Sequence, residues 1–382
     1  MRNTLARTRD CDWGNLQGLK PRLTPQLAAL VGDGYVRSAE SLPVQSFGQL
    51  VREVAALSYL NKDHLLFFRG QSRDHKNKAG ASTLYPGIYR GERVPKSQLE
   101  LNFDLLTSAS ARLCDELAAR HIEGHRDVKR RRYIQWSILQ HYEVCATPLL
   151  DITQSLLVAC SFAFLEAGDD DPYVFVLGLP YVTNRVSINS EQDIVNVRLL
   201  SICPPEALRP YYQEGFVAGT DEVMTEFDSK AELDFNQRLV AKFRLSRKSA
   251  FWRSGFKALP RESLYPNHDV VEGICSRLRL DLDTGVAAGR IGAFLKEWTD
   301  LETLFVGWAR DNAPQAKVRT VREALDILQQ SQRVSPEMLQ SLQHLRRLRN
   351  EVVHRPGEAS REQVIQGTHM AGMLIRELSF MR

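Results

Sequence analysis

The segment that most restricts the fold is residues 173–179, YVFVLGL, which is apolar at nearly every position. A strand with one face in water alternates apolar and polar side chains, whereas a strand without alternation is buried on both faces. The segment therefore predicts a central strand with other structure packed on each side of its sheet. Further strands are expected at residues 64–69, 148–153, 194–200, 215–217 and 238–245.

Segments with helical spacing of apolar residues lie between these strands, at residues 44–60, 97–140 and 154–167. Interleaved strands and helices predict an α/β or α+β domain, which we place at residues 36–280. Residues 1–35 contain Pro, Gly and mixed charge. We interpret them as an N-terminal arm, either flexible or folded as a cap on this domain.

The last hundred residues have a different pattern, in which large apolar residues are spaced by three and four. One such series is Phe294, Trp298, Leu301, Phe305 and Trp308. It predicts a helix with one apolar face. Three more helices are expected at residues 321–328, 335–352 and 360–378, the last two beginning with capping sequences. Four helices with short connections predict a bundle at residues 285–382.

Composition limits the classes of protein to consider. Hydrophobic residues make up 43% and charged residues 25% of the chain, as in globular proteins. The net charge of +4 is too small to indicate nucleic-acid binding by itself. Signal-peptide and membrane-spanning patterns are not visible, so we expect a cytoplasmic protein without membrane contact. The 6 cysteines are far apart, which predicts reduced thiols and no metal site.

Three segments carry polar groups suited to binding. In Phe67-Phe68-Arg69-Gly70-Gln71, an arginine ends an apolar strand and can bind a phosphate through two hydrogen bonds. The glycine lets backbone approach a ligand closely; the alternative for Arg69 is an ion pair at the strand end. In the second segment, residues 140–153, Asp151 lies beside a buried strand and needs partners, either structural groups or a ligand. We expect a packing role for His141. The third segment is residues 209–216.

These segments, in this order, resemble the FRG domain, a family with a Phe/Tyr-Arg-Gly signature. The resemblance covers roughly residues 36–275. The matching motifs are Phe-Arg-Gly-Gln, Leu-x-Pro-x-x-x-Arg at residues 84–90, Gln-His-Tyr running into Thr-x-Leu-Leu-Asp-x-Thr, and a shortened Gln-x-Gly-x-Phe at residues 213–216. Glu143 and Ile152 stand where the family usually has Gly and Trp.

The family's order of elements is similar to the ADP-ribosyltransferase fold, which implies an α+β domain with a mixed sheet, NAD as substrate, and no metal. The implied catalytic residues are Arg69, Asp151, Thr153, Gln213 and Glu214. The implied NAD-binding residues are Arg69, Gly70, Gln71, His141, Tyr142 and Thr153. In this scheme Arg69 binds the pyrophosphate, Asp151 and Thr153 shape the nicotinamide pocket, and Gln213 or Glu214 acts on the ribose or the acceptor.

Arg349, Asn350 and His354 in the third C-terminal helix resemble the HEPN signature, which implies RNA cleavage at a dimer interface. Five helical steps turn through about 140°, so the arginine and histidine face different ways on one regular helix. Joint action would require a disturbed helix end or a second subunit. The alternative is that these residues tie the helix end to its neighbour, in a bundle that serves binding or homodimerisation.

Residues 129–132 form a basic run, which with Arg120 and Arg126 is either a solvated helix face or a guide for a polyanion such as an RNA acceptor. Two functions follow. The first is an NAD-dependent ADP-ribosyltransferase, a toxin or effector of bacterial anti-phage defence or a toxin-antitoxin system, with an antitoxin or inhibitor protein as partner. The alternative is an FRG domain that senses a ligand, with the HEPN-like bundle as ribonuclease or dimerisation module.

Overall fold

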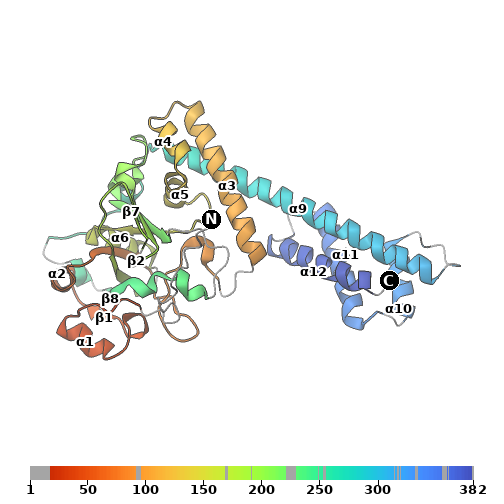
Figure 1. Cartoon of the computed structure of the whole chain (residues 1–382), viewed down its shortest axis with the longest axis horizontal. Coiled ribbons are helices and arrows are strands. Elements are labelled where there is room, and N and C mark those ends of the chain that lie inside the picture. Colours follow the sequence, from red (N-terminus) through yellow and green to blue (C-terminus); the bar gives the residue numbers. More distant parts are fainter. Residues whose placement is uncertain are drawn as a thin grey trace, which may run out of the picture. The chain divides into compact units, whose positions relative to one another are not determined.

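The structure is a computed structural model that describes residues 18–91, 96–167, 171–190, 192–220, 229–247, 249–252, 255–313, 315, 318, 320–331, 334–354, 359 and 361–380. The chain divides into two units, Met1–Arg279 and Leu280–Arg382, which are described separately. Figure 1 labels the helices and strands.

Unit 1 is built on a mixed sheet of eight strands in the order β1-β8-β4-β2-β3-β7-β6-β5. The strands are β1 (Leu42–Val44), β2 (Leu65–Gln71), β3 (Leu149–Thr153), β4 (Tyr173–Leu179), β5 (Val186–Asn189), β6 (Ile194–Arg198), β7 (Gly215–Thr220) and β8 (Leu239–Leu245). The strands β1 and β8 are parallel, and the other neighbouring pairs are antiparallel. The predicted α+β class is confirmed.

The central strand β4 is buried on both faces, as its sequence predicted. Val174 and Val176 belong to one core cluster, which includes residues of α2 (Phe47–Leu60) and α6 (Leu156–Glu166). Phe175 and Leu177 belong to a second cluster on the opposite face. Alternate side chains of one strand thus enter two cores, which explains the absence of polar residues.

The remaining helices of unit 1 are short, apart from one. They are α1 (Pro25–Val31), α3 (Lys96–Ala119), α4 (His125–Arg130), α5 (Arg132–His141), α7 (Arg209–Tyr212) and α8 (Arg261–Leu264). Single turns of 3-10 helix are η1 (Val36–Ser38), η2 (Gly87–Tyr89), η3 (Leu199–Ser201), η4 (Lys230–Leu233), η5 (Phe235–Arg238) and η6 (Ser249–Trp252). Serine hydroxyls cap α2 and α6, where Ser46 and Ser155 accept bonds from the first turns.

Two details differ from the sequence predictions, and the described part of the expected arm packs on the domain, which is one of the two predicted alternatives. The helical stretch at 97–140 is three helices, because the chain turns at Gly124, whose φ of 77° is left-handed, and is extended at Arg131. The expected arm contains α1, whose Leu27 is buried in the core; residues 1–17 lie outside the described part. The strands β1 and β5 were not predicted, because each is too short to show a pattern.

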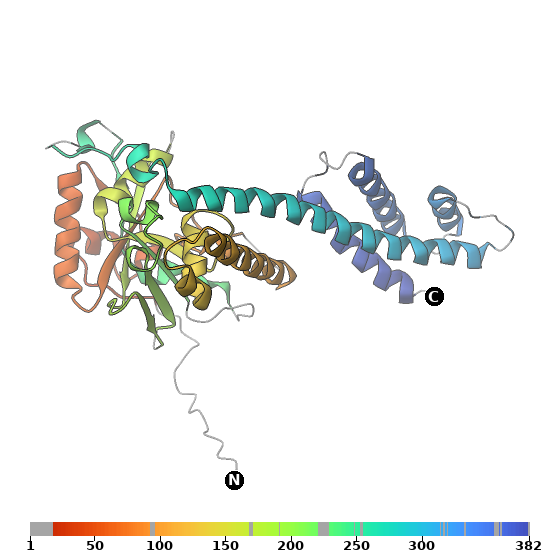
Figure 2. The same ribbon diagram turned by 90° about the horizontal axis from the view of Figure 1, so that it is seen from above.

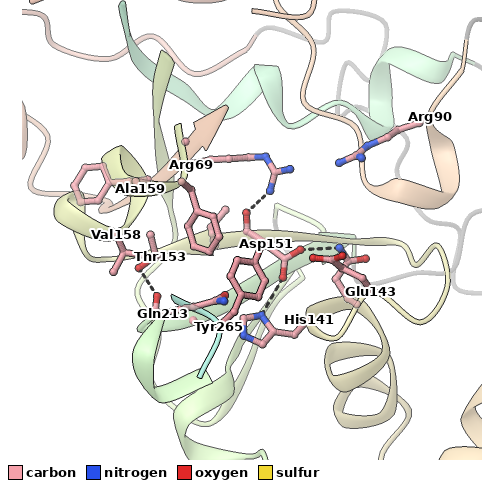
Figure 3. A pocket seen from close by; sticks show the side chains of 16 residues that line it. Arg69, Arg90, His141, Glu143, Asp151, Thr153, Val158, Ala159, Gln213 and Tyr265 are labelled. Carbon is pink, nitrogen blue, oxygen red and sulfur yellow. Dashed lines mark hydrogen bonds and ion pairs between the residues drawn. The ribbon is translucent and has the colours of Figure 1, made fainter. Parts of the chain in front are cut away.

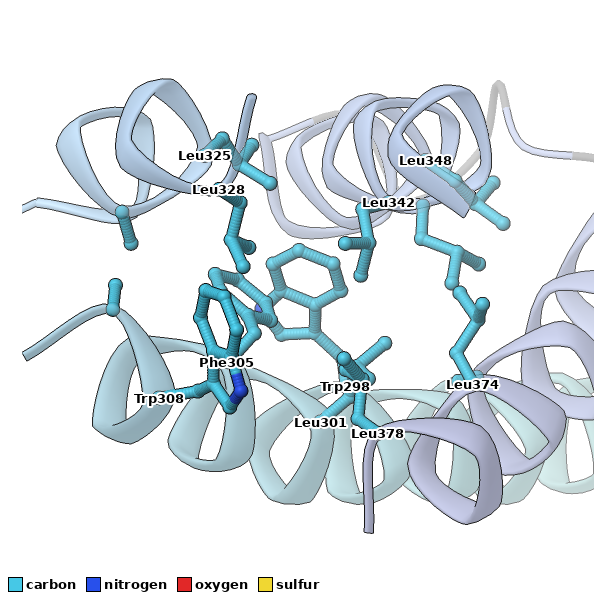
Figure 4. Close-up of a cluster of buried hydrophobic side chains, with 14 of the residues drawn as sticks. Trp298, Leu301, Phe305, Trp308, Leu325, Leu328, Leu342, Leu348, Leu374 and Leu378 are labelled. Atoms are coloured by element: carbon cyan, nitrogen blue, oxygen red, sulfur yellow. The ribbon is translucent and has the colours of Figure 1, made fainter. Parts of the chain in front are cut away.

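Unit 2 holds the predicted four-helix arrangement, formed by α9 (Val270–Asn312), α10 (Val321–Ser331), α11 (Pro336–His354) and α12 (Arg361–Phe380). Figure 4 shows its core, in which the predicted residues Trp298, Leu301, Phe305 and Trp308 meet leucines of the other helices. The helix α9 begins 15 residues before the expected boundary at 285, and the division between the units falls inside it (Figure 2). Among the described residues, no helix combines the length and apolar character that a membrane span requires.

Candidate functional site

A cleft of about 300 Å³ in unit 1 is lined by residues of β2, β3, β7, α5 and α6 together with the loops around them (Figure 3). Its polar lining includes Arg69, Gln140, His141, Asp151 and Gln213. The three segments singled out in the sequence therefore converge on one cavity, although their residues are far apart along the chain.

The position of Arg69 follows from the way β2 pairs with its neighbours. The strand β2 pairs with β4 along its whole length, from Leu65 to Gln71, but with β3 only at Phe68 and Thr153. Next to that single pair, the Arg69 Nη1 atom donates a hydrogen bond of 2.6 Å to the backbone oxygen of Asp151 (Figure 3). A side chain thus satisfies a carbonyl that strand pairing leaves open, and this bond holds the guanidinium at the cleft.

The Asp151 carboxylate is held by two neighbouring side chains. Its Oδ2 accepts a 2.6 Å hydrogen bond from Gln140 Nε2, and its Oδ1 lies 3.3 Å from His141 Nδ1. Gln140 is fixed in turn, because its Oε1 accepts a 2.5 Å bond from the Thr147 hydroxyl. This network orients the carboxylate within the cleft, where its side chain remains 37% exposed.

These contacts set the charge of Asp151. Burial raises the pKa of its carboxyl, but the hydrogen bond with His141, the nearby charges of His141 and Arg69, and the bond from Gln140 lower it by more. The pKa therefore lies below its ordinary value, and the group is an anion at neutral pH. The cleft thus contains a fixed carboxylate close to a fixed guanidinium.

The backbone at Gly215 makes room for the His141 ring. A Cβ atom at residue 215 would lie 3.1 Å from Cε1 of His141 and 3.6 Å from its Nε2. The imidazole is buried, and its Nε2 atom has no hydrogen-bond partner among the described residues. Its backbone oxygen accepts a 2.9 Å bond from Arg209 Nη1. His141 thus packs as expected and also orients Asp151.

Gly70 has a packing role that the sequence interpretation did not include. A Cβ atom there would lie 1.8 Å from the Ala159 oxygen and 2.9 Å from the Ala163 nitrogen, both in the backbone of α6. Gly70 is therefore required for the close packing of α6 on β2. Gly70 also lines the cleft, so the expectation that it lets backbone approach a ligand stays a prediction.

Thr153 has a structural role at the cleft wall. Its hydroxyl lies 3.0 Å from the Gln213 oxygen and 3.1 Å from the Glu214 oxygen, and it accepts a bond from the Ser155 nitrogen. The Gln213 side chain lines the cleft and donates a 2.8 Å bond to the Leu264 oxygen. Glu214 is exposed with a left-handed φ of 44° and does not line the cleft. The geometry thus places Gln213, but not Glu214, at the cavity.

Two of the predicted NAD-binding residues also lie away from this cleft. Gln71 lines a neighbouring cavity. Tyr142 is fully buried, and its hydroxyl donates a 2.7 Å bond to Asp269. The Arg209 guanidinium lies 4.8 Å from the ring centres of both Tyr142 and Tyr265. Tyr142 therefore supports the segment carrying His141 and does not face the ligand space.

Several lining residues were not predicted as site residues. Arg90 and Gln140 had a signal, because each belongs to a family motif noted in the sequence. Glu143 has a left-handed φ of 55°, which explains why the family usually has glycine there. Phe162 and Tyr265 had no sequence signal, since only the fold brings them to the cleft.

The other predicted groups lie elsewhere. In α11, Arg349 Nη1 donates a 3.0 Å bond to Asn350 Oδ1, while the side chain of His354 lies outside the described part. The basic run at 129–132 is exposed, and none of these described residues lines the cleft. Among the described residues, no group of three His, Cys, Asp or Glu side chains could hold a metal ion.

The fold and cleft define a class of α+β domain with an arginine and a carboxylate at one cavity beside the central strands. Residues 64–172 match the FRG domain family, so this part of the chain is an FRG domain. The matched region contains Arg69, His141 and Asp151, whereas Gln213 and the C-terminal helices lie beyond it. Comparisons with curated proteins and with solved structures gave no match.

Proposed function

We propose that the FRG domain binds NAD in this cleft and transfers its ADP-ribose group to an acceptor. The observation that carries the proposal is the convergence of the Arg69 guanidinium and the Asp151 carboxylate on one cavity, with Gln213 in the same wall. A volume of about 300 Å³ is at the lower end of the range for small-molecule sites. It suits the nicotinamide riboside half of NAD, with the pyrophosphate near Arg69.

The two charges suit two parts of NAD, the pyrophosphate and the ribose whose glycosidic bond breaks. Arg69 can hold an anionic pyrophosphate through paired, charge-assisted hydrogen bonds. Cleavage of the glycosidic bond leaves its electron pair on neutral nicotinamide and positive charge on the ribose. An anionic Asp151 can stabilise that oxocarbenium-like centre, because its pKa lies below the ordinary value and its geometry is fixed in advance.

The acceptor then forms a bond to the ribose C1′ atom and gives up a proton. Gln213 cannot take this proton, because an amide is not a base at neutral pH. Its side-chain nitrogen also donates a hydrogen bond to the Leu264 backbone oxygen. Glu143 is an exposed carboxylate in the cleft wall, and in this proposal it replaces Glu214 as the acceptor's base. Glu143 follows the end of α5, and its left-handed backbone changes the direction of the chain there.

The test uses NAD labelled in its adenylate phosphate, mixed with purified full-length protein and cell extract. The change Arg69→Ala should reduce label transfer about 10- to 100-fold, since charge-assisted hydrogen bonds contribute about 1.5–3 kcal/mol. Arg69→Lys should also fail, because lysine cannot form the paired bonds. Arg73→Ala is the matched control, since Arg73 is exposed and lines neither this cleft nor the cavity beside it.

The same proposal makes the chain a toxin-like effector, kept in check by an inhibitor protein and dimerising through its bundle. Expression in bacteria should then slow growth, and Arg69→Ala should relieve the effect. Undiminished toxicity of the Arg69→Ala protein would contradict the proposal. RNA cleavage without NAD that His354→Ala abolishes would instead favour the alternative, in which the FRG domain is a sensor and the bundle a ribonuclease.

A further inference from the structure

A second cavity, which we name the basic groove, adjoins the cleft and has a volume of about 920 Å³. It shares Arg69, Gly70 and Arg90 with the cleft, so a ligand in one can reach a ligand in the other. The basic residues in its lining are Arg69, His75, Lys76, Lys78, Arg90 and Lys230. Among the described lining residues, none is an aspartate or a glutamate.

The acidic residues near the groove are engaged in the interior. Asp74 is 6% exposed at its side chain, accepts a 2.9 Å bond from the Ser82 hydroxyl and lies 3.6 Å from Nζ of the buried Lys242. Asp234 accepts backbone bonds from Leu84 at 2.8 Å and Asn236 at 2.9 Å. The charge of Asp74 is therefore matched by Lys242 in the interior, whereas Asp234 offsets part of the charge of Lys230.

A fixed turn positions two of the lysines. The Asn77 nitrogen donates a 2.8 Å bond to the Ala81 oxygen, and the Asn77 side chain accepts bonds of 3.0 Å from the Ala79 and Ala81 nitrogens. Gly80 completes the turn with a left-handed φ of 78°. Lys76 and Lys78 stand on this turn, and the only described ion pair of Lys76 is a 3.9 Å contact with the exposed Glu40. Exposed pairs of this kind are weak.

The opposite side of the groove is also held in place. Lys230 donates a hydrogen bond to the Gly91 oxygen, and its Nζ atom lies 4.4 Å from the centre of the Tyr85 ring. The field within the groove is positive. Burial lowers the pKa of His75, and the charges of Arg73 and Arg90 lower it further, with only a partial offset from Asp74.

We infer that the basic groove binds the phosphate backbone of a single-stranded nucleic acid, which is the acceptor of ADP-ribose. The acceptor role rests on the proposed function. In the proposed function, Arg69 binds the pyrophosphate of NAD. The four other permanent cations of the lining match a ligand with several phosphates; they are Lys76, Lys78, Arg90 and Lys230. A single strand is required because a base can enter the adjacent cleft only when it is outside a stack.

In the transfer step, the bond between nicotinamide and the ribose C1′ atom breaks and nicotinamide leaves with the electron pair. A nitrogen or oxygen of the nucleotide bonds to C1′ and releases its proton to Glu143. The reaction is a substitution, so no oxidant or reductant is needed. The exposed run at 129–132, which the sequence suggested as the guide for a polyanion, lines neither cavity among its described residues.

The experiment measures binding of a labelled single strand of about 12 nucleotides to the full-length protein without NAD, by fluorescence anisotropy between about 50 and 200 mM salt. Four phosphate contacts predict a slope of about −2.8 for log K against log salt. The double change Lys76→Gln with Lys78→Gln should make the slope shallower by about 1.4. RNA and DNA strands of one sequence should give equal slopes, because the groove contacts phosphates.

The matched control is Lys129→Gln with Arg130→Gln, which removes the same charge from exposed positions in α4. Its slope should equal that of the wild type. The inference is overturned by a flat salt response, by a control that changes the slope as much as the groove variant, or by a duplex that binds as tightly as the strand. It is also overturned if ADP-ribose displaces the strand, because the groove would then hold the adenylate half of NAD.

A parallel titration with NAD separates this inference from the proposed function. If NAD binds and the strand does not, the inference fails and the transferase proposal survives. If the strand binds with the expected slope and NAD does not bind, the groove is a nucleic-acid site and the transferase proposal fails. Thermal unfolding of each variant verifies that the exposed substitutions leave the protein folded.

Discussion

The substitution Gly70→Ala tests the packing that forms the cleft. The added Cβ would lie 1.8 Å from the Ala159 oxygen, whereas ordinary contacts of such an atom begin near 3.4 Å. The backbone of α6 therefore has to retreat by about 1.6 Å, because neither contacting atom belongs to a flexible side chain that could rotate away. Overpacking of a core costs about 1–3 kcal/mol, and a clash between backbone atoms belongs at the upper end.

A loss of about 3 kcal/mol should lower the Tm of a domain of this size by about 6–12 °C. The measurement is thermal unfolding followed by circular dichroism or calorimetry. Gly48→Ala is the matched control, because a Cβ at that helical position meets nothing within 4 Å and should not destabilise α2. A Gly70→Ala protein that unfolds within about 2 °C of the wild type would refute this account of the β2–α6 contact.

Three further predictions concern other contacts. The pKa of Asp151 is lowered in the folded state, so its carboxylate stabilises the fold above the ordinary pKa of 3.8 and ceases to do so as the pH falls through the lower value. The difference in unfolding free energy between wild type and Asp151→Asn should thus be larger at pH 6 than at pH 3, and an equal difference would contradict the assignment. Tyr142→Phe should lose about 1–3 kcal/mol in urea unfolding, because the buried Asp269 loses a donor, while NAD affinity stays unchanged. Leu301→Ala should destabilise the bundle by about 2–5 kcal/mol, as followed by tryptophan fluorescence, and a loss below about 1 kcal/mol would argue against its full burial.

Much of the fold was predictable because its patterns are local. The spacing of Phe294, Trp298 and Phe305 indicates a helix face without knowledge of its partners, and all three are buried in the bundle. The start of α9 was missed because small residues near the boundary at 285 hide the helical pattern.

The candidate site was predictable only in part. Arg69 and Asp151 could be proposed from motifs, since each stands beside an apolar strand. The bond from Gln213 to Leu264 and the exposure of Glu214 could not, because they depend on contacts between distant segments and on a left-handed backbone. Likewise, the Phe-Arg-Gly motif predicts that something lies close to the backbone of Gly70. The sequence cannot show whether this is a helix or a ligand.

The hydrogen bond that positions the Arg69 guanidinium is accepted by the backbone oxygen of residue 151, which every amino acid supplies. Mutation of residue 151 can therefore remove the negative charge from the cleft without detaching the arginine. During evolution the anion-binding half of such a site can persist after the carboxylate has been lost. Under the proposed function, a descendant of that kind would still hold phosphates but no longer cleave NAD, which offers a short route from an enzyme to a nucleotide receptor.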